Sequence, residues 1–191
     1  MLKILVIDEI QTRTRELCTQ LAQSGYQMAA VLPSADNLTQ QVAAFKPDVI
    51  LVDTNSPSRD ILEHLAVMDR TAPRPVVLFG SDRTNDTIRQ VVEAGVSTYV
   101  VDGLDISRLQ PLIEIAVARF EHYQSLKGKL EEANRQLDER KIIDQAKNLL
   151  IKHRKLDEST AYALLRKTAM SRGETIATVA RELVGSASLL L

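Results

Sequence analysis

Residues 4–9 read ILVIDE and residues 47–53 read PDVILVD, and these two runs decide the fold. Each is a short apolar segment that ends in a carboxylate, which is typical of a buried strand in a parallel sheet. Similar apolar runs recur along the first half of the chain. The expected strands are Leu2–Ile7, Gln27–Leu32, Asp48–Val52, Pro75–Phe79 and Thr98–Val101.

Amphipathic segments separate these strands. The expected helices are Thr12–Gln23, Asp36–Phe45, Ser58–Asp69 and Thr84–Glu93. Alternating strands and helices predict an α/β domain with a parallel sheet covered on both faces. Because the crossovers in such sheets are right-handed, we expect a flavodoxin-like, doubly wound, five-stranded domain over residues 1–104.

Composition narrows the class of protein. The 191 residues contain one cysteine, Cys18, so no disulfide can form within the chain. No apolar run approaches the roughly 20 residues that span a bilayer, and the first residues lack the zones of a signal peptide. We therefore expect a cytoplasmic protein.

Charge is distributed unevenly along the chain. The net charge is −1, yet Lys141–Val184 carries nine Lys and Arg residues against five Asp and Glu residues. A basic tail on an acidic body suits a domain that binds polyanions, although a solvated helical surface would show the same excess.

The periodicity changes after residue 104. Apolar residues recur in heptads over residues 105–140, which predicts one long coiled-coil helix and a homodimer. The alternative is an amphipathic helix that packs against its own domain. The expected dimer seam is Leu109, Leu112, Ala116, Tyr123, Leu126, Leu130 and Leu137.

Residues 141–191 predict a small bundle of three helices. Asp157 is the expected N-cap of the second helix. Ser171 and Glu174 have the spacing of a capping box, which would start the third.

The carboxyl ends of the first and third strands carry Asp8, Glu9 and Asp53. Three carboxylates at this edge would suit Mg²⁺, with Asp53 as acceptor of a phosphoryl group. On the runs ILVIDE and PDVILVD, residues 1–104 resemble the receiver domains of response regulators.

Two residues depart from the receiver pattern. Gly80 stands where receivers usually carry Thr or Ser, and Asp102 stands where they carry Lys. An added carboxylate would repel a phosphoryl group that the lysine normally stabilises. We therefore expect that phosphorylation of Asp53 is not the main switch, and that the pocket serves packing or partner docking.

The tail resembles the ANTAR domain, an RNA-binding module of transcription antiterminators. The resemblance rests on pairs such as Ala146-Lys147, Ala161-Tyr162 and Leu165-Arg166. The order of receiver, coiled coil and ANTAR domain resembles the AmiR/NasT family, and most closely its NasT-type members. That resemblance implies control of nitrate and nitrite assimilation genes, and a NasS-like nitrate sensor protein as the sequestering partner.

The charges of the tail fit RNA binding. Cations would hold phosphates, and an aromatic ring or a guanidinium plane would stack on unpaired loop bases. The expected RNA-binding residues are Lys147, Arg154, Tyr162, Arg166, Lys167 and Arg172. For Tyr162, a ring packed between helices is the alternative.

Three hypotheses follow. The first is a non-enzymatic antiterminator that binds leader hairpins and is released from a partner. The second is a regulator activated by phosphorylation of Asp53, and the third is a dimeric adaptor that binds only proteins. No cofactor is expected other than Mg²⁺ in the acidic pocket.

Overall fold

The computed structural model describes residues 1–11, 14–101 and 106–188. The first part of the chain alternates strands and helices as expected. The elements are β1 (Lys3–Asp8), α1 (Thr14–Gln23), β2 (Gln27–Leu32), α2 (Leu38–Phe45), β3 (Val49–Asp53), α3 (Arg59–Thr71), β4 (Val76–Phe79), α4 (Asn85–Glu93) and β5 (Thr98–Val100).

The strands form one parallel five-stranded sheet in the order β2-β1-β3-β4-β5. This order confirms the flavodoxin-like fold. In the register of β1 and β3, Asp8 lies opposite Asp53, so both carboxylates stand at the same edge of the sheet.

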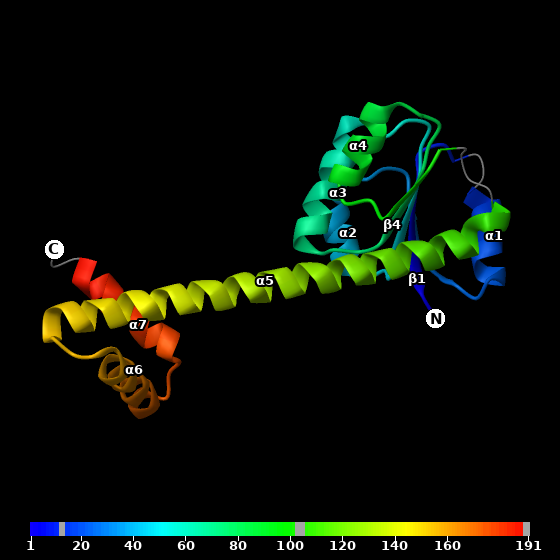
Figure 1. The fold of residues 1–191 in the computed structure, drawn as a ribbon. Coiled ribbons are helices and arrows are strands. Elements are labelled where there is room, and N and C mark those ends of the chain that lie inside the picture. The colour runs from blue at the N-terminus through cyan, green and yellow to red at the C-terminus, as the bar shows by residue number, and fades with distance from the viewer. Residues whose placement is uncertain (12–13, 102–105, 189–191) are drawn as a thin grey trace. The chain divides into compact units, whose positions relative to one another are not determined.

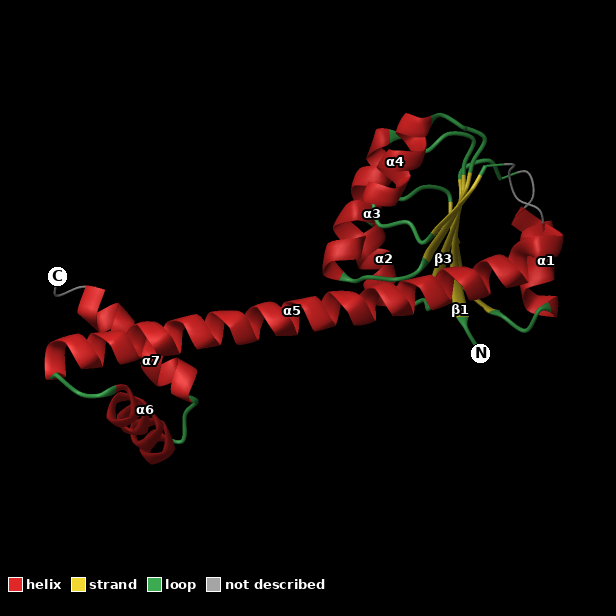
Figure 2. Cartoon of the chain, in the orientation of Figure 1, coloured by secondary structure: helices red, strands yellow, loops and turns green. Residues whose placement is uncertain are grey.

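Alternate residues of each strand point into two apolar cores, as the period of two requires. Ile7, Ile50 and Leu78 pack on one face against α2, α3 and α4. Val6 and Phe79 pack on the other face against α1 and the start of the long helix α5 (Leu109–Arg154). Figure 2 shows these helices on the two sides of the sheet.

A 3-10 turn (Ile106–Arg108) leads into α5 (Leu109–Arg154), a single helix of 46 residues (Figure 1). The chain divides into two compact units, Met1–Gln124 and Ser125–Leu191, so α5 contributes residues to both. Although α5 is long, none of the helices in the described residues is apolar enough to cross a membrane.

The second unit contains the end of α5, α6 (Glu158–Arg172) and α7 (Ile176–Ser188). Ala146 of α5, Ala161 and Leu165 of α6, and Val179 and Ala180 of α7 form its core. The alanines at these positions allow the helices to approach closely, which is how so small a unit excludes water.

One of the two capping predictions for this unit is confirmed. Asp157 caps α6, because its Oδ1 accepts a hydrogen bond of 2.9 Å from the backbone N–H of Thr160. The predicted capping box is wrong. Ser171 lies within α6, Gly173 ends that helix with φ of 67°, and the Thr175 hydroxyl accepts from the N–H of Thr178 to start α7.

Candidate nucleic-acid interface and acidic pocket

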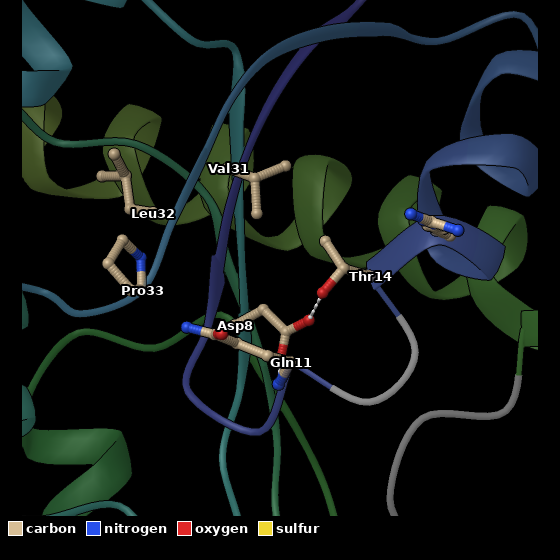
Figure 3. Close-up of a pocket in the computed structure, with 7 residues that line it drawn as sticks. Asp8, Gln11, Thr14, Val31, Leu32 and Pro33 are labelled. Carbon is tan, nitrogen blue, oxygen red and sulfur yellow. Dashed lines mark hydrogen bonds between the residues drawn. The ribbon is translucent and has the colours of Figure 1, made fainter.

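The carboxylate of Asp8 is buried and already has hydrogen-bond donors. Its Oδ1 accepts from the backbone N–H of Ile10 at 3.1 Å and of Gln11 at 2.7 Å. Its Oδ2 accepts from the hydroxyl of Thr14 (Figure 3). Asp8 therefore holds the backbone of Ile10 and Gln11 and the first residue of α1, and a metal ion would have to compete with these donors.

Glu9 and Asp53 are the other two carboxylates of this edge. Glu9 is exposed, and its Oε2 accepts a hydrogen bond of 2.9 Å from the hydroxyl of Thr54. Asp53 is 8 % exposed. In the part of the chain that the structure describes, no three His, Cys, Asp or Glu side chains gather as a metal site. The role of Asp8, Glu9 and Asp53 as Mg²⁺ ligands therefore stays a prediction.

A cavity of about 590 Å³ lies beside Asp8 rather than between the carboxylates. It is lined by Asp8, Gln11, Thr14, Arg15, Val31, Leu32 and Pro33, and Figure 3 shows these residues around it. Neither Glu9 nor Asp53 lines this cavity.

The ring of Tyr99 occupies the space where a receiver carries its Thr or Ser side chain. A Cβ added to Gly80 would lie 2.7 Å from the Tyr99 hydroxyl oxygen. That hydroxyl donates a 2.8 Å hydrogen bond to the backbone oxygen of Asp82. Burial, and then the charge of Asp82, raise the pKa of the Tyr99 phenol above its ordinary value. The other departure, Asp102, lies outside the described residues.

Lys147, which was predicted to contact RNA, is paired with two carboxylates. Its Nζ lies 2.7 Å from a carboxylate oxygen of Asp144 and 2.7 Å from one of Glu158, and its side chain is 17 % exposed. Hydrogen bonds to Asp144 and then Glu158 raise the pKa of Lys147 further above its ordinary value. Because Glu158 belongs to α6, Lys147 joins α5 to α6.

Tyr162 and Arg166 lie together on an exposed flank of α6. Tyr162 is 42 % exposed and Met170, two turns further on, is 73 % exposed. Arg166 and Lys167 are exposed as well. The tyrosine ring is therefore not packed between helices, and the flank presents an aromatic face beside cations.

Arg154 and Arg172 lie elsewhere, beside a cavity between the helices of the second unit. Arg172 also forms an ion pair of 2.8 Å with Glu182 of α7. The six predicted residues thus divide among three places: the ion pairs of Lys147, the flank of α6 and this cavity.

The predicted dimer seam is split. Leu109 and Ala116 are 3 % and 0 % exposed, and with half-buried Leu112 they pack into the core of the first unit. Leu109 and Ala116 are unavailable to a second copy, because they are buried against the sheet. The remaining seam residues are exposed by 52–62 %, and they are Tyr123, Leu126, Leu130 and Leu137.

Sequence reasoning missed the partners that hold these sites. Asp144 precedes Lys147 by three residues in a helix, so this pair carried a local signal. Thr14, Thr54 and Tyr99 gave none, because each contacts residues that the fold brings to it.

Comparison with known proteins assigns both parts of the chain. Residues 4–114 match the response regulator receiver domain, and residues 131–184 match the ANTAR domain. Solved structures similar to the first part include a diguanylate cyclase receiver domain from Desulfovibrio desulfuricans (TM-score 0.56, 18 % identity, covering 64 % of this chain and 98 % of that one). A CheY-like receiver from Methanospirillum hungatei gives a TM-score of 0.56 at 15 % identity, covering 64 % and 98 %.

Three curated relatives match different shares of the chain. The transcriptional regulatory protein PdtaR of Mycobacterium tuberculosis is 26 % identical over 93 % of this chain and 87 % of its own length. The aliphatic amidase regulator of Pseudomonas aeruginosa is 31 % identical over 52 % of this chain and 50 % of its own. The nitrate regulatory protein of Klebsiella oxytoca is 29 % identical over 44 % and 21 %. With a receiver match over more than half its length and an ANTAR match beyond it, the chain belongs to the ANTAR-type response regulators.

Proposed function

We propose that the protein is a transcription antitermination regulator that binds hairpin RNA in mRNA leaders. ANTAR-type regulators are non-enzymatic and have an RNA-binding output domain. The observation that carries the proposal is the exposed flank of α6, where Tyr162 and Arg166 lie one turn apart.

This flank offers the two kinds of contact that single-stranded loops require. The Tyr162 ring and the planar Arg166 guanidinium can each stack on an unpaired base. Lys167, on the same helix, supplies a charge for the phosphate backbone, so affinity should fall as salt rises.

We propose that two copies associate through the exposed seam of Tyr123, Leu126, Leu130 and Leu137. A dimer would present two ANTAR domains to paired hairpins, and the first contact would raise the effective concentration for the second. Capture of both hairpins would favour an RNA fold that excludes a terminator.

Control by a partner protein is the proposed input. The target genes are those of nitrate and nitrite assimilation, and a NasS-like sensor sequesters the regulator until ligand binds. A relative that is named a nitrate regulatory protein supports the gene class. The donors around Asp8 and the Tyr99 ring beside Gly80 support an input other than phosphorylation.

A regulator activated by phosphorylation of Asp53 is the second candidate. The receiver match and the place of Asp53 at the end of β3 favour it. Incubation with acetyl phosphate and Mg²⁺ separates the two inputs. A stable phosphoryl group on Asp53 that raises RNA affinity would refute control by partner release alone.

The RNA function is tested with a fluorescent two-hairpin leader RNA and the full-length protein across a salt series. Tyr162→Ala and Arg166→Ala should each weaken binding about tenfold, the loss expected for one specific contact. Arg135→Ala is the matched control, because Arg135 lies on α5 and is paired with Glu132 and Glu139. If the wild type binds no hairpin at any salt concentration, RNA binding is refuted and a protein-binding adaptor remains.

A further inference from the structure

Two cavities lie in the second unit, one between α5 and α7 and one among α5, α6 and α7. Their volumes are about 370 and 330 Å³. Both are lined by Leu150 and Arg154 of α5 and by Leu183 and Ser186 of α7. The two cavities share these four lining residues, and together they are called the three-helix groove here.

The floor of the three-helix groove is apolar and its rim is charged. Leu150 and Leu165 are 6 % and 2 % exposed, and half-buried Leu164 and Leu183 border the same space. Arg154 of α5 and Arg172 of α6 both lie at the rim. The fold therefore brings together two cations that are distant in the sequence.

An acceptor faces the same space. Glu182 of α7 lines the groove and receives a 2.8 Å contact from Nη1 of Arg172. His153 adds a further polar edge beside the apolar residues. The groove therefore combines an apolar floor, two planar cations and one carboxylate.

This combination fits a flat heterocycle that carries an anionic group. The volume lies at the lower end of the roughly 300–1,000 Å³ of small-molecule sites, which suits one ring system rather than a longer chain. Guanidinium planes stack on base rings and bind phosphates, and carboxylates accept from base N–H groups. We propose that the three-helix groove takes one unpaired nucleobase of the bound RNA.

The groove is a separate contact from the flank of α6. Leu164 lines the groove, and Tyr162 precedes it by two residues, which places the two side chains roughly 160° apart around the helix. A loop that stacks on Tyr162 therefore leaves the groove open to a second base. The inference rests on the proposed RNA binding and adds the site of one base to it.

The test uses the full-length protein and hairpin RNAs with 2-aminopurine at one loop position at a time. Ser186→Trp places an indole in the groove from an exposed position on α7. It should weaken binding at least tenfold and abolish the fluorescence change at one loop position. Ser125→Trp, at an exposed position on α5 outside the groove, is the matched control and should bind as the wild type does.

Arg154→Lys provides a second test that keeps the charge and removes the planar group. It should reduce the 2-aminopurine response while leaving the dependence of affinity on salt unchanged, whereas Lys152→Arg should change neither. Thermal unfolding of each variant checks that the three helices remain folded.

The outcomes distinguish failure of the groove inference from failure of the proposed RNA binding. If Ser186→Trp and Arg154→Lys bind every hairpin as the wild type does, the groove inference is overturned while RNA binding stands. If the wild type binds no hairpin, the proposed function fails and the groove inference fails with it. A loss confined to one loop position supports both.

Discussion

Replacing Gly80 with alanine should displace the Tyr99 ring and destabilise the receiver unit. The added Cβ would lie 2.7 Å from the hydroxyl oxygen and 3.0 Å from Cε2 of Tyr99. The first distance is about 0.8 Å short of an ordinary contact of roughly 3.5 Å, so the ring has to move. The movement breaks the 2.8 Å hydrogen bond to the Asp82 oxygen.

The expected cost follows from these two effects. One lost hydrogen bond costs about 0.5–1.5 kcal/mol, and forcing extra volume into a packed site costs about 1–3 kcal/mol. Because the obstructing atoms are the end of a side chain that can rotate, we expect a total of about 1–3 kcal/mol. At about 4 °C for each kcal/mol in a domain of this size, Tm should fall by about 4–12 °C.

Scanning calorimetry of the full chain measures this change. The same substitution in a Tyr99→Ala background should have almost no effect, because the obstructing ring is gone and the two changes are coupled. Gly128→Ala is the control, since no atom within 4 Å would meet a Cβ at Gly128 in α5. That change should stabilise the helix by about 0.5–1 kcal/mol. An unaltered Tm for Gly80→Ala, or an equal loss without Tyr99, would refute the reasoning.

Three further predictions concern the rest of the chain. Lys147→Ala should lower the Tm of the second unit without changing the salt dependence of RNA binding, because Asp144 and Glu158 already pair with this amine. A weaker salt dependence at an unchanged Tm would contradict this. Leu130→Asp should convert a dimer to a monomer in sedimentation velocity, because Leu130 is 62 % exposed on the seam, and an unchanged sedimentation coefficient would count against that interface. Hydrogen bonds from the hydroxyls of Ser159 and Thr160 hold the pKa of Asp157 well below 3.8 in the folded protein. The Asp157 carboxylate therefore stabilises the fold above pH 3.8, and this stabilisation is lost as the pH falls toward the pKa in the folded protein. Asp157→Asn should therefore reduce the decrease of Tm at acid pH. If Tm falls with pH as steeply in the variant as in the wild type, Asp157 does not stabilise the helix in this way.

The strands were predictable because their composition is unambiguous. The interior residues of β1 and β3 are buried on both faces of the sheet, so the sequence shows continuous apolar runs there. The predicted strand ends differ from the observed ones by at most one residue, because pairing with the neighbouring strand decides where hydrogen bonding stops.

The apolar residues of α5 show that a heptad pattern does not predict which surface they contact. Leu109 and Leu130 occupy the same heptad position, yet one is buried against the sheet and the other is exposed. A heptad pattern states that one face of a helix is apolar and does not state what covers that face. The sequence therefore predicted the helix, and only the fold separated the residues used within the chain from those left for a partner.

For the candidate RNA-binding residues, the number of charges in the sequence likewise does not show which charges are exposed. A count of cations treats Lys147 and Arg166 alike, although carboxylates hold the first and the second is exposed. The groove was beyond sequence reasoning, because Arg154 and Arg172 meet only after three helices have packed. Local chemistry identified the residue types, and tertiary contacts decided their roles.

The burial of Leu109, Ile113 and Ala116 affects how this protein can be divided. These residues belong to α5 and also complete one face of the sheet, so a fragment that ends with β5 would expose Val6 and Phe79 to water. An isolated receiver should therefore be cut after the third turn of α5. An exchange of output domains between such regulators should likewise join the chains beyond Ala116. The helix that leads to the RNA-binding domain is also the last structural element of the receiver.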